Sequence, residues 1–158
     1  MILSTQNPDG VMTGHAAFVP LLLVATASIA QAGEAIDAVQ PFYDHPGLEL
    51  EASARDRFVD PARRILDLND AIKKGGEDGC LDPALAFDDA DEDPNQIART
   101  LKLSESIEGD LAKVVAAFKA DGEVSRLEWK LKRVDGAWKV ADIVSMSKDW
   151  ALSQFNCE

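Results

Sequence analysis

The sequence predicts an α+β protein in which helices of the first half pack on a curved antiparallel sheet of three to four strands formed by the second half. Three observations support this fold class. Apolar residues recur at helical spacing within residues 34–74, and apolar and polar residues alternate in consecutive runs within residues 101–144. Turn-forming pairs separate these runs, so neighbouring strands are expected to pair as hairpins.

Residues 1–32 have the pattern of a secretory signal peptide. An apolar run over residues 16–30 leads into Ala30-Gln31-Ala32, a small-x-small cleavage pattern, although no Lys or Arg precedes the run. The run is shorter than the roughly 20 apolar residues that a membrane span needs. We therefore expect cleavage after Ala32, a single domain at 33–158 without a membrane span, and an exported location, either periplasmic or secreted.

The chain is strongly acidic. Its 158 residues include 16 Lys and Arg against 28 Asp and Glu, which gives a net charge of −12. Asp9 is the single charged residue of these types among the first 32, so cleavage leaves a domain of net charge −11. Such a charge disfavours binding to nucleic acid or to an anionic membrane surface and attracts a basic protein partner. A homodimer remains open.

Two helices are predicted in the first half. Residues 34–44 carry apolar side chains at helical spacing, and Pro41 is expected to kink this helix or to end it early. Asp60 and Pro61 match an N-cap and a first helical position, and Gly75 marks the end of the second helix.

The clearest strand signal is a hairpin over residues 126–144. Polar and apolar residues alternate on both sides of Asp135-Gly136, a dipeptide typical of tight primed turns. Two earlier runs, residues 101–107 and 112–118, alternate in the same way. Strict alternation would place four residues of the returning strand on one face: Trp138, Val140, Asp142 and Val144. The single charged residue among them is the feature that most suggests a functional site.

The two cysteines, Cys80 and Cys157, are expected to form a disulfide because an exported domain folds in an oxidising compartment. Closing so long a loop would stabilise the fold by roughly 4 kcal/mol. It would also hold the aperiodic segment 75–94. A catalytic thiol is the alternative, and it would need a nearby base, for which His45 is the single histidine after residue 32.

Three parts of the chain carry a family resemblance: the helical first half, residues 84–91 (ALAFDDAD) and residues 127–143 (LEWKLKRVDGAWKVADI). Over Glu34–Met146 this pattern resembles the nuclear transport factor 2-like (cystatin-like) superfamily, in particular its small exported members of unknown function. The resemblance implies a cone-shaped domain whose curved sheet wraps a helix and leaves a pocket at the open end. It does not select an activity, because the superfamily includes enzymes, ligand carriers and interaction modules.

Several chemistries lack their sequence motifs. The chain has no phosphate-binding GxxxxGK[ST], no GxGxxG, no GxSxG and no paired His or Cys spacing for zinc. The acidic run near residues 88–93 departs from a calcium loop, because Pro94 stands where the template needs Gly. We therefore predict neither a metal nor a cofactor.

The candidate site residues are two carboxylates on apolar strand faces, Asp142 and Glu105. Inside the implied pocket, burial would raise their pKa values and suit them to general acid–base chemistry or to binding a cation. Alternatively, they lie at the pocket mouth, solvated or paired with Lys130 or Arg126. Three aromatic residues complete the predicted lining: Tyr43, Trp129 and Trp138.

These patterns favour an exported, non-enzymatic binding domain that uses either the cone pocket or the acidic surface to hold a small ligand or a basic protein. Its most concrete protein-binding form is an immunity or inhibitor protein that blocks a toxic enzyme in the cell envelope. Two alternatives stay open. One is a metal-independent enzyme with Asp142 as general acid or base, assisted by Glu105 and Tyr43, and the other is a structural module without a ligand.

Overall fold

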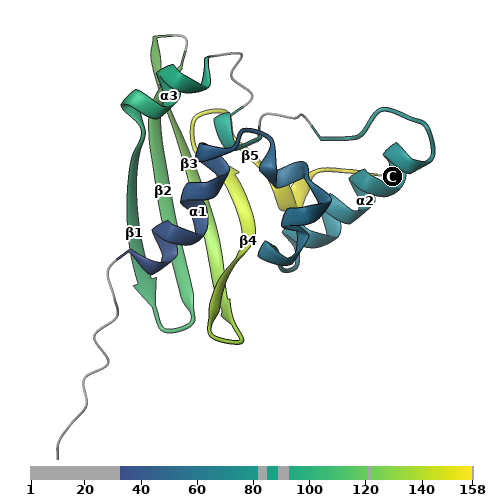
Figure 1. Cartoon of the computed structure of the whole chain (residues 1–158), viewed down its shortest axis with the longest axis horizontal. Helices are drawn as coiled ribbons and strands as arrows, with labels where there is room; N and C mark the ends of the chain where they lie inside the picture. Colours follow the sequence, from purple (N-terminus) through teal and green to yellow (C-terminus); the bar gives the residue numbers. More distant parts are fainter. Residues whose placement is uncertain (1–32, 82–84, 89–92, 121, 158) are drawn as a thin grey trace, which may run out of the picture. The chain divides into compact units, whose positions relative to one another are not determined.

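The computed structural model describes residues 33–81, 85–88, 93–120 and 122–157. Helices precede strands along the chain, as predicted (Figure 1). The elements are α1 (Glu34–Asp44), η1 (Leu48–Leu50), η2 (Ala52–Arg57), α2 (Ala62–Lys74), η3 (Leu85–Phe87), α3 (Pro94–Thr100), β1 (Lys102–Glu108), β2 (Leu111–Ala120), β3 (Glu123–Val134), β4 (Ala137–Ser145), β5 (Trp150–Ala151) and η4 (Leu152–Gln154). The predicted signal peptide and its cleavage site lie outside the described residues and remain predictions.

The strands form one antiparallel sheet in the order β1-β2-β3-β4-β5, which confirms the α+β class. The four predicted strand regions correspond to β1 to β4, and the two-residue β5 adds a fifth strand to the three or four expected. The turn between β3 and β4 has the predicted form. Asp135 and Gly136 both have positive φ, 52° and 80°, as a tight primed turn requires.

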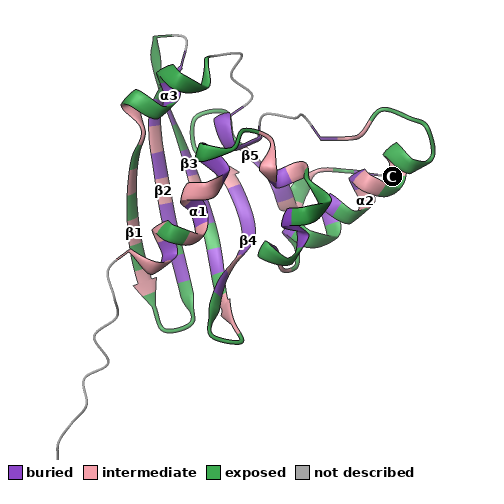
Figure 2. Ribbon diagram, in the orientation of Figure 1, coloured by how far each residue is buried: buried purple, intermediate pink, exposed green. Residues whose placement is uncertain are grey.

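The sheet has a helix-covered face and an outer face. Side chains alternate between buried and accessible along β2 and β3, and between partly buried and exposed along β1, so one face of these strands packs on the core and the other faces solvent (Figure 2). Helix α1 packs against β1, β2 and β4, while α3 packs against β2 and α2 against β4. The core therefore lies between the helices and one face of the sheet.

Helix α1 does not end at Pro41. It continues to Asp44 with Pro41 inside it, which confirms the predicted range 34–44, and of the two alternatives for Pro41 the early end is wrong. Phe42 and Tyr43, which follow the proline, are buried against the sheet. Burial of these two aromatic side chains stabilises the last helical turn in spite of the hydrogen bond that a proline cannot donate.

Helix α2 begins at Ala62, with no side-chain cap, so the expected capping by Asp60 is wrong. The preceding residues pair with the sheet instead. Phe58 forms a parallel bridge with Val140, and the Val59 N–H donates to the Val140 carbonyl at 2.9 Å. This strand-like pairing determines how the chain enters the helix.

The aromatic side chains of the core come from both helices and strands. Trp129 is completely buried and stacks on Phe42, with ring centroids 4.9 Å apart. Further ring contacts join the remaining members of this cluster: Tyr43, Phe58, Phe87 and Phe118. These large rings fill the space between α1 and the helix-covered face of the sheet.

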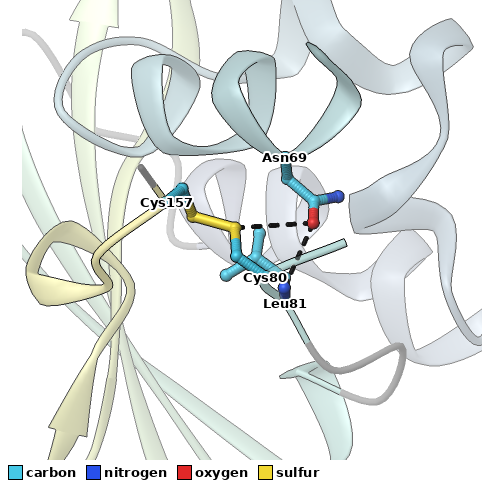
Figure 3. Close-up of a disulfide and its surroundings, with 4 residues drawn as sticks. All are labelled: Asn69, Cys80, Leu81 and Cys157. Atoms are coloured by element: carbon cyan, nitrogen blue, oxygen red, sulfur yellow. Dashed lines mark hydrogen bonds between the residues drawn. A yellow bond between two sulfur atoms is a disulfide. The ribbon is translucent and has the colours of Figure 1, made fainter. Parts of the chain in front are cut away.

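The predicted disulfide between Cys80 and Cys157 is present, with Cα atoms 5.4 Å apart (Figure 3). Asn69 of α2 lies beside it and accepts a hydrogen bond from the Leu81 N–H at 3.1 Å. Its Oδ1 atom also lies 3.6 Å from Cys80 Sγ, which is a contact because a disulfide sulfur carries no proton. The disulfide therefore joins the C-terminal segment to the segment that follows α2.

Candidate functional site

A β-bulge places Asp142 on the outer face of the sheet. Leu131 pairs with Val140, whereas its neighbour Lys130 pairs with Asp142, so Ala141 is an extra residue in β4. One extra residue reverses the facing of every side chain beyond it. The expectation that Asp142 shares a face with Val140 is therefore wrong.

The Asp142 carboxylate is occupied by hydrogen bonds within its own chain. Oδ1 accepts from the N–H groups of Ile143 at 3.0 Å and Ser153 at 2.9 Å. Oδ2 accepts from the Ser153 hydroxyl at 2.8 Å and lies 4.0 Å from Lys130 Nζ. Asp142 is thus positioned as a clamp that holds the C-terminal segment on β4.

The Glu105 carboxylate caps a helix. Glu105 lies on β1 opposite the buried Val114, so its side chain points to the helix-covered face. Its two oxygens accept hydrogen bonds from the N–H groups of Gly33 at 2.6 Å and Ile36 at 2.9 Å. These donors belong to the first turn of α1, where unpaired N–H groups and the helix dipole favour a negative charge.

The structure does not bring the two candidate carboxylates together. Glu105 lies on β1 and Asp142 on β4, which are separated by β2 and β3. Three strand spacings amount to about 14 Å, and the two side chains point to opposite faces. A paired-carboxylate mechanism, with one acid and one base acting on the same substrate, has no basis in this geometry.

The structure does bring Tyr43 and Trp129 together, but as part of the core. The indole N–H of Trp129 donates to the Tyr43 hydroxyl at 3.0 Å, and both side chains are buried. Burial raises the pKa of Tyr43 above its ordinary value, against a smaller lowering by the Trp129 hydrogen bond. The phenol therefore remains neutral over the physiological pH range.

Trp138 lies apart from this pair, near the β3–β4 turn. The Arg133 guanidinium carbon lies 4.3 Å from the centroid of its ring, a cation–π contact. Its side chain borders an open hollow of about 370 Å³, together with Ser53, Asp56 and Arg57 among others. The five predicted pocket residues are thus divided among an outer clamp, a helix cap, the core and a surface hollow.

Sequence reasoning missed two buried acids, Glu49 and Asp88. Glu49 is completely buried, its Oε1 accepts from the Ala86 N–H at 3.2 Å, and burial raises its pKa. Asp88 is also buried and accepts from the Trp150 indole N–H at 3.1 Å, while Lys148 Nζ donates to its carbonyl. No periodicity around either residue marked it for burial. Tertiary packing alone places them inside.

The hollows bordered by described residues open to solvent and lie mainly at the surface of the sheet. Three of these contact its outer face. One, of about 250 Å³, is bordered by Lys113, Lys130 and Asp142 among others. A second, of about 480 Å³, lies beside the β1–β2 turn. The third, of about 500 Å³, lies between the C-terminal end of α3 and the ends of β1, β2 and β3. Among the described residues, no group of three or more His, Cys, Asp or Glu is placed to hold a metal ion.

Comparisons with known proteins address the fold. No family model matches the sequence, and no curated protein matches it. Among solved structures, the chain is similar to one chain in the crystal structure of the type VI native effector-immunity complex Tae3-Tai3 from Ralstonia pickettii. The two chains are 18% identical with a TM-score of 0.50, over 73% of this chain and 97% of the other. At this level of identity the similarity establishes a shared fold and nothing further.

No helix in the described part of the chain is both long and apolar enough to cross a membrane. The observed disulfide is compatible with an exported protein, because such bonds persist mainly in oxidising compartments. Fold and disulfide together describe a small α+β domain, stabilised by a covalent link between its C-terminal end and the segment after α2.

Proposed function

We propose that this chain is an exported immunity protein that binds a toxic enzyme in the cell envelope and blocks it. The observation that carries the proposal is the fold similarity to a component of an effector-immunity complex, which extends over 97% of that component. The nuclear transport factor 2-like resemblance remains part of the proposal for the fold family.

An effector-immunity complex consists of a toxic enzyme and its inhibitor. The chemistry of the described residues favours the role of inhibitor for this chain. Both cysteines are joined in the disulfide, so neither provides a nucleophilic thiolate. The carboxylates of Glu105 and Asp142 accept hydrogen bonds from the protein itself. Tyr43 is buried as a neutral phenol. With these groups engaged in the fold, the outer surface is the part of the molecule best suited to binding.

The disulfide also suits a protein that must persist outside the cytoplasm. It closes a loop with a sequence separation of 77 residues, which constrains the unfolded chain strongly. The net charge of −12 adds long-range attraction for a basic partner and keeps the free protein soluble. Both properties would be useful for an inhibitor that meets its target in the envelope.

The experiment first identifies the target enzyme by screening the proteins encoded by the genes that flank this chain's gene. The enzyme is directed to the periplasm of a test strain with and without the full-length chain, and the purified pair is analysed by size-exclusion chromatography with light scattering. We expect growth to be rescued by the chain, a stable complex and loss of enzyme activity. Cell death at equal expression together with two separate peaks would contradict the proposal. A small molecule retained by the purified chain in native mass spectrometry would instead favour a ligand carrier.

A further inference from the structure

The outer face of the sheet carries a charge opposite to that of the whole molecule. The chain has a net charge of −12, yet six cationic side chains of β1 to β3 point outward: Lys102, Lys113, Lys119, Arg126, Lys130 and Lys132. On the described strands, the acids of this face are Glu108, Glu128 and Asp142. The acidic excess of the protein therefore lies elsewhere, and this face is locally basic.

The cations at the two ends of this face are engaged differently. Near the β3–β4 turn, Lys113 lies 3.6 Å from Glu128 and Lys130 lies 4.0 Å from Asp142. At the α3 end, four cations form no ion pair with any residue that the structure describes: Arg99, Lys102, Lys119 and Arg126. We call these four residues the basic groove. Like charges that lie close together favour an anionic partner.

The basic groove has a defined shape. Its four cations border the hollow of about 500 Å³, whose described lining also includes Ala117 and Val124. Lys102 and Arg126 both pair with Ala117 from opposite sides, so this small side chain lies between two long ones. Two strand spacings separate the flanking cations by about 10 Å. Val124 is 46% exposed, so the groove also offers apolar surface that a partner can cover.

We propose that the basic groove binds an acidic segment of the partner protein, with Asp or Glu side chains on the cations and an apolar side chain against Val124. The assignment rests on the proposed function, because it requires a protein partner. A short acidic segment matches cations about 10 Å apart, a separation that a single phosphate does not bridge. A nucleic acid would bring many phosphates toward a molecule that repels them with a net charge of −12. A short acidic segment carries few charges. The acidic residues elsewhere on the molecule repel it only weakly, because interactions beyond about 10 Å are screened at physiological salt.

The first test compares two charge reversals in the full chain. The groove variant is Lys102→Glu with Arg126→Glu. The control is Arg64→Glu with Lys74→Glu on α2, where both residues are exposed and the described structure gives them no ion pair. Both variants change the net charge equally. We expect the affinity for the target enzyme identified in the experiment above to fall at least 100-fold in the groove variant and less than threefold in the control.

Binding is measured by calorimetry after circular dichroism has shown that each variant is folded. If the charge reversal prevents folding, the variant Lys102→Ala with Arg126→Ala is used instead. We expect its affinity for the enzyme to be at least tenfold lower than that of the wild type. A complex that forms equally well with either groove variant overturns the groove assignment and leaves the proposed function intact. If the wild-type chain forms no complex, the proposed function fails and the groove assignment fails with it.

Carbodiimide cross-linking provides a second, direct measurement, because it joins lysine amines to carboxylates in contact. We expect cross-links from Lys102 or Lys119 to Asp or Glu of the enzyme, identified by mass spectrometry. Cross-links confined to lysines outside the groove would overturn the proposal. The proposal would also be overturned if the wild type bound a single-stranded RNA 12-mer or inorganic phosphate and the groove variant did not. The basic groove would then bind another kind of anion.

Discussion

Replacing Asp142 by alanine tests whether this side chain holds the C-terminal segment on β4 or binds a partner. The change removes the acceptors of three hydrogen bonds, two from Ser153 and one from the Ile143 N–H. Hydrogen bonds to a charged group contribute about 1.5–3 kcal/mol each, but the partly accessible Ser153 can turn to water. We therefore expect a loss of about 2–4 kcal/mol in the free energy of unfolding, and a melting temperature roughly 10 °C lower.

The assay is urea unfolding followed by tryptophan fluorescence for the wild type, Asp142→Ala, Ser153→Ala and the double variant. A direct contact predicts a coupling energy of about 1–2 kcal/mol between the two positions. Glu123→Ala, which removes an exposed carboxylate at the start of β3, should change stability by less than about 0.5 kcal/mol. Unchanged unfolding of Asp142→Ala together with loss of partner binding would refute the clamp and restore Asp142 as a site residue.

Three further predictions concern groups that the fold uses. Glu105→Gln should lower stability by about 1 kcal/mol because one N–H of the first turn of α1 loses its charged acceptor, whereas Glu108→Gln on the same strand should have little effect in the same urea titration. Replacing both cysteines by serine should cost up to about 4.5 kcal/mol in the chain-entropy model, a loss that reductant should reproduce in the wild type and not in the variant. Burial raises the pKa of Glu49, so its contribution to stability is present below the unfolded pKa and is lost as pH rises through the folded pKa. The difference in unfolding free energy between Glu49→Gln and the wild type should therefore shift in favour of the variant as pH rises from 4 to 8, and a difference independent of pH would contradict this.

Local patterns predicted much of the fold. Helix spacing identified α1 and the body of α2, alternation identified β1 to β4, and Asp135-Gly136 identified the turn between β3 and β4. These features depend on neighbouring residues, whose side chains and backbone preferences act over a few positions. The disulfide was also predictable, because a pair of cysteines in an exported domain leaves one natural pairing.

The candidate site was less predictable, because it depended on register and on distant partners. Alternation assigned Asp142 to the wrong face, since a bulge at Ala141 has no sequence signature here and reverses the strand beyond it. Glu105 was expected in a pocket, but it caps a helix that begins about 70 residues earlier in the chain, a contact that no local pattern encodes. The burial of Glu49 depends in the same way on residues far away in sequence.

The sequence by itself determined the order of helices and strands, the hairpin around Asp135-Gly136 and the cysteine pair, because these follow from local preferences and composition. Only the tertiary structure decided the use of each acid and base. It engages Glu105 and Asp142 in holding the fold together and collects, at one end of the sheet, four cations that form no ion pair with the residues that the structure describes. The four cationic residues lie apart along the chain, and they border one groove only because strand register and helix packing bring them together.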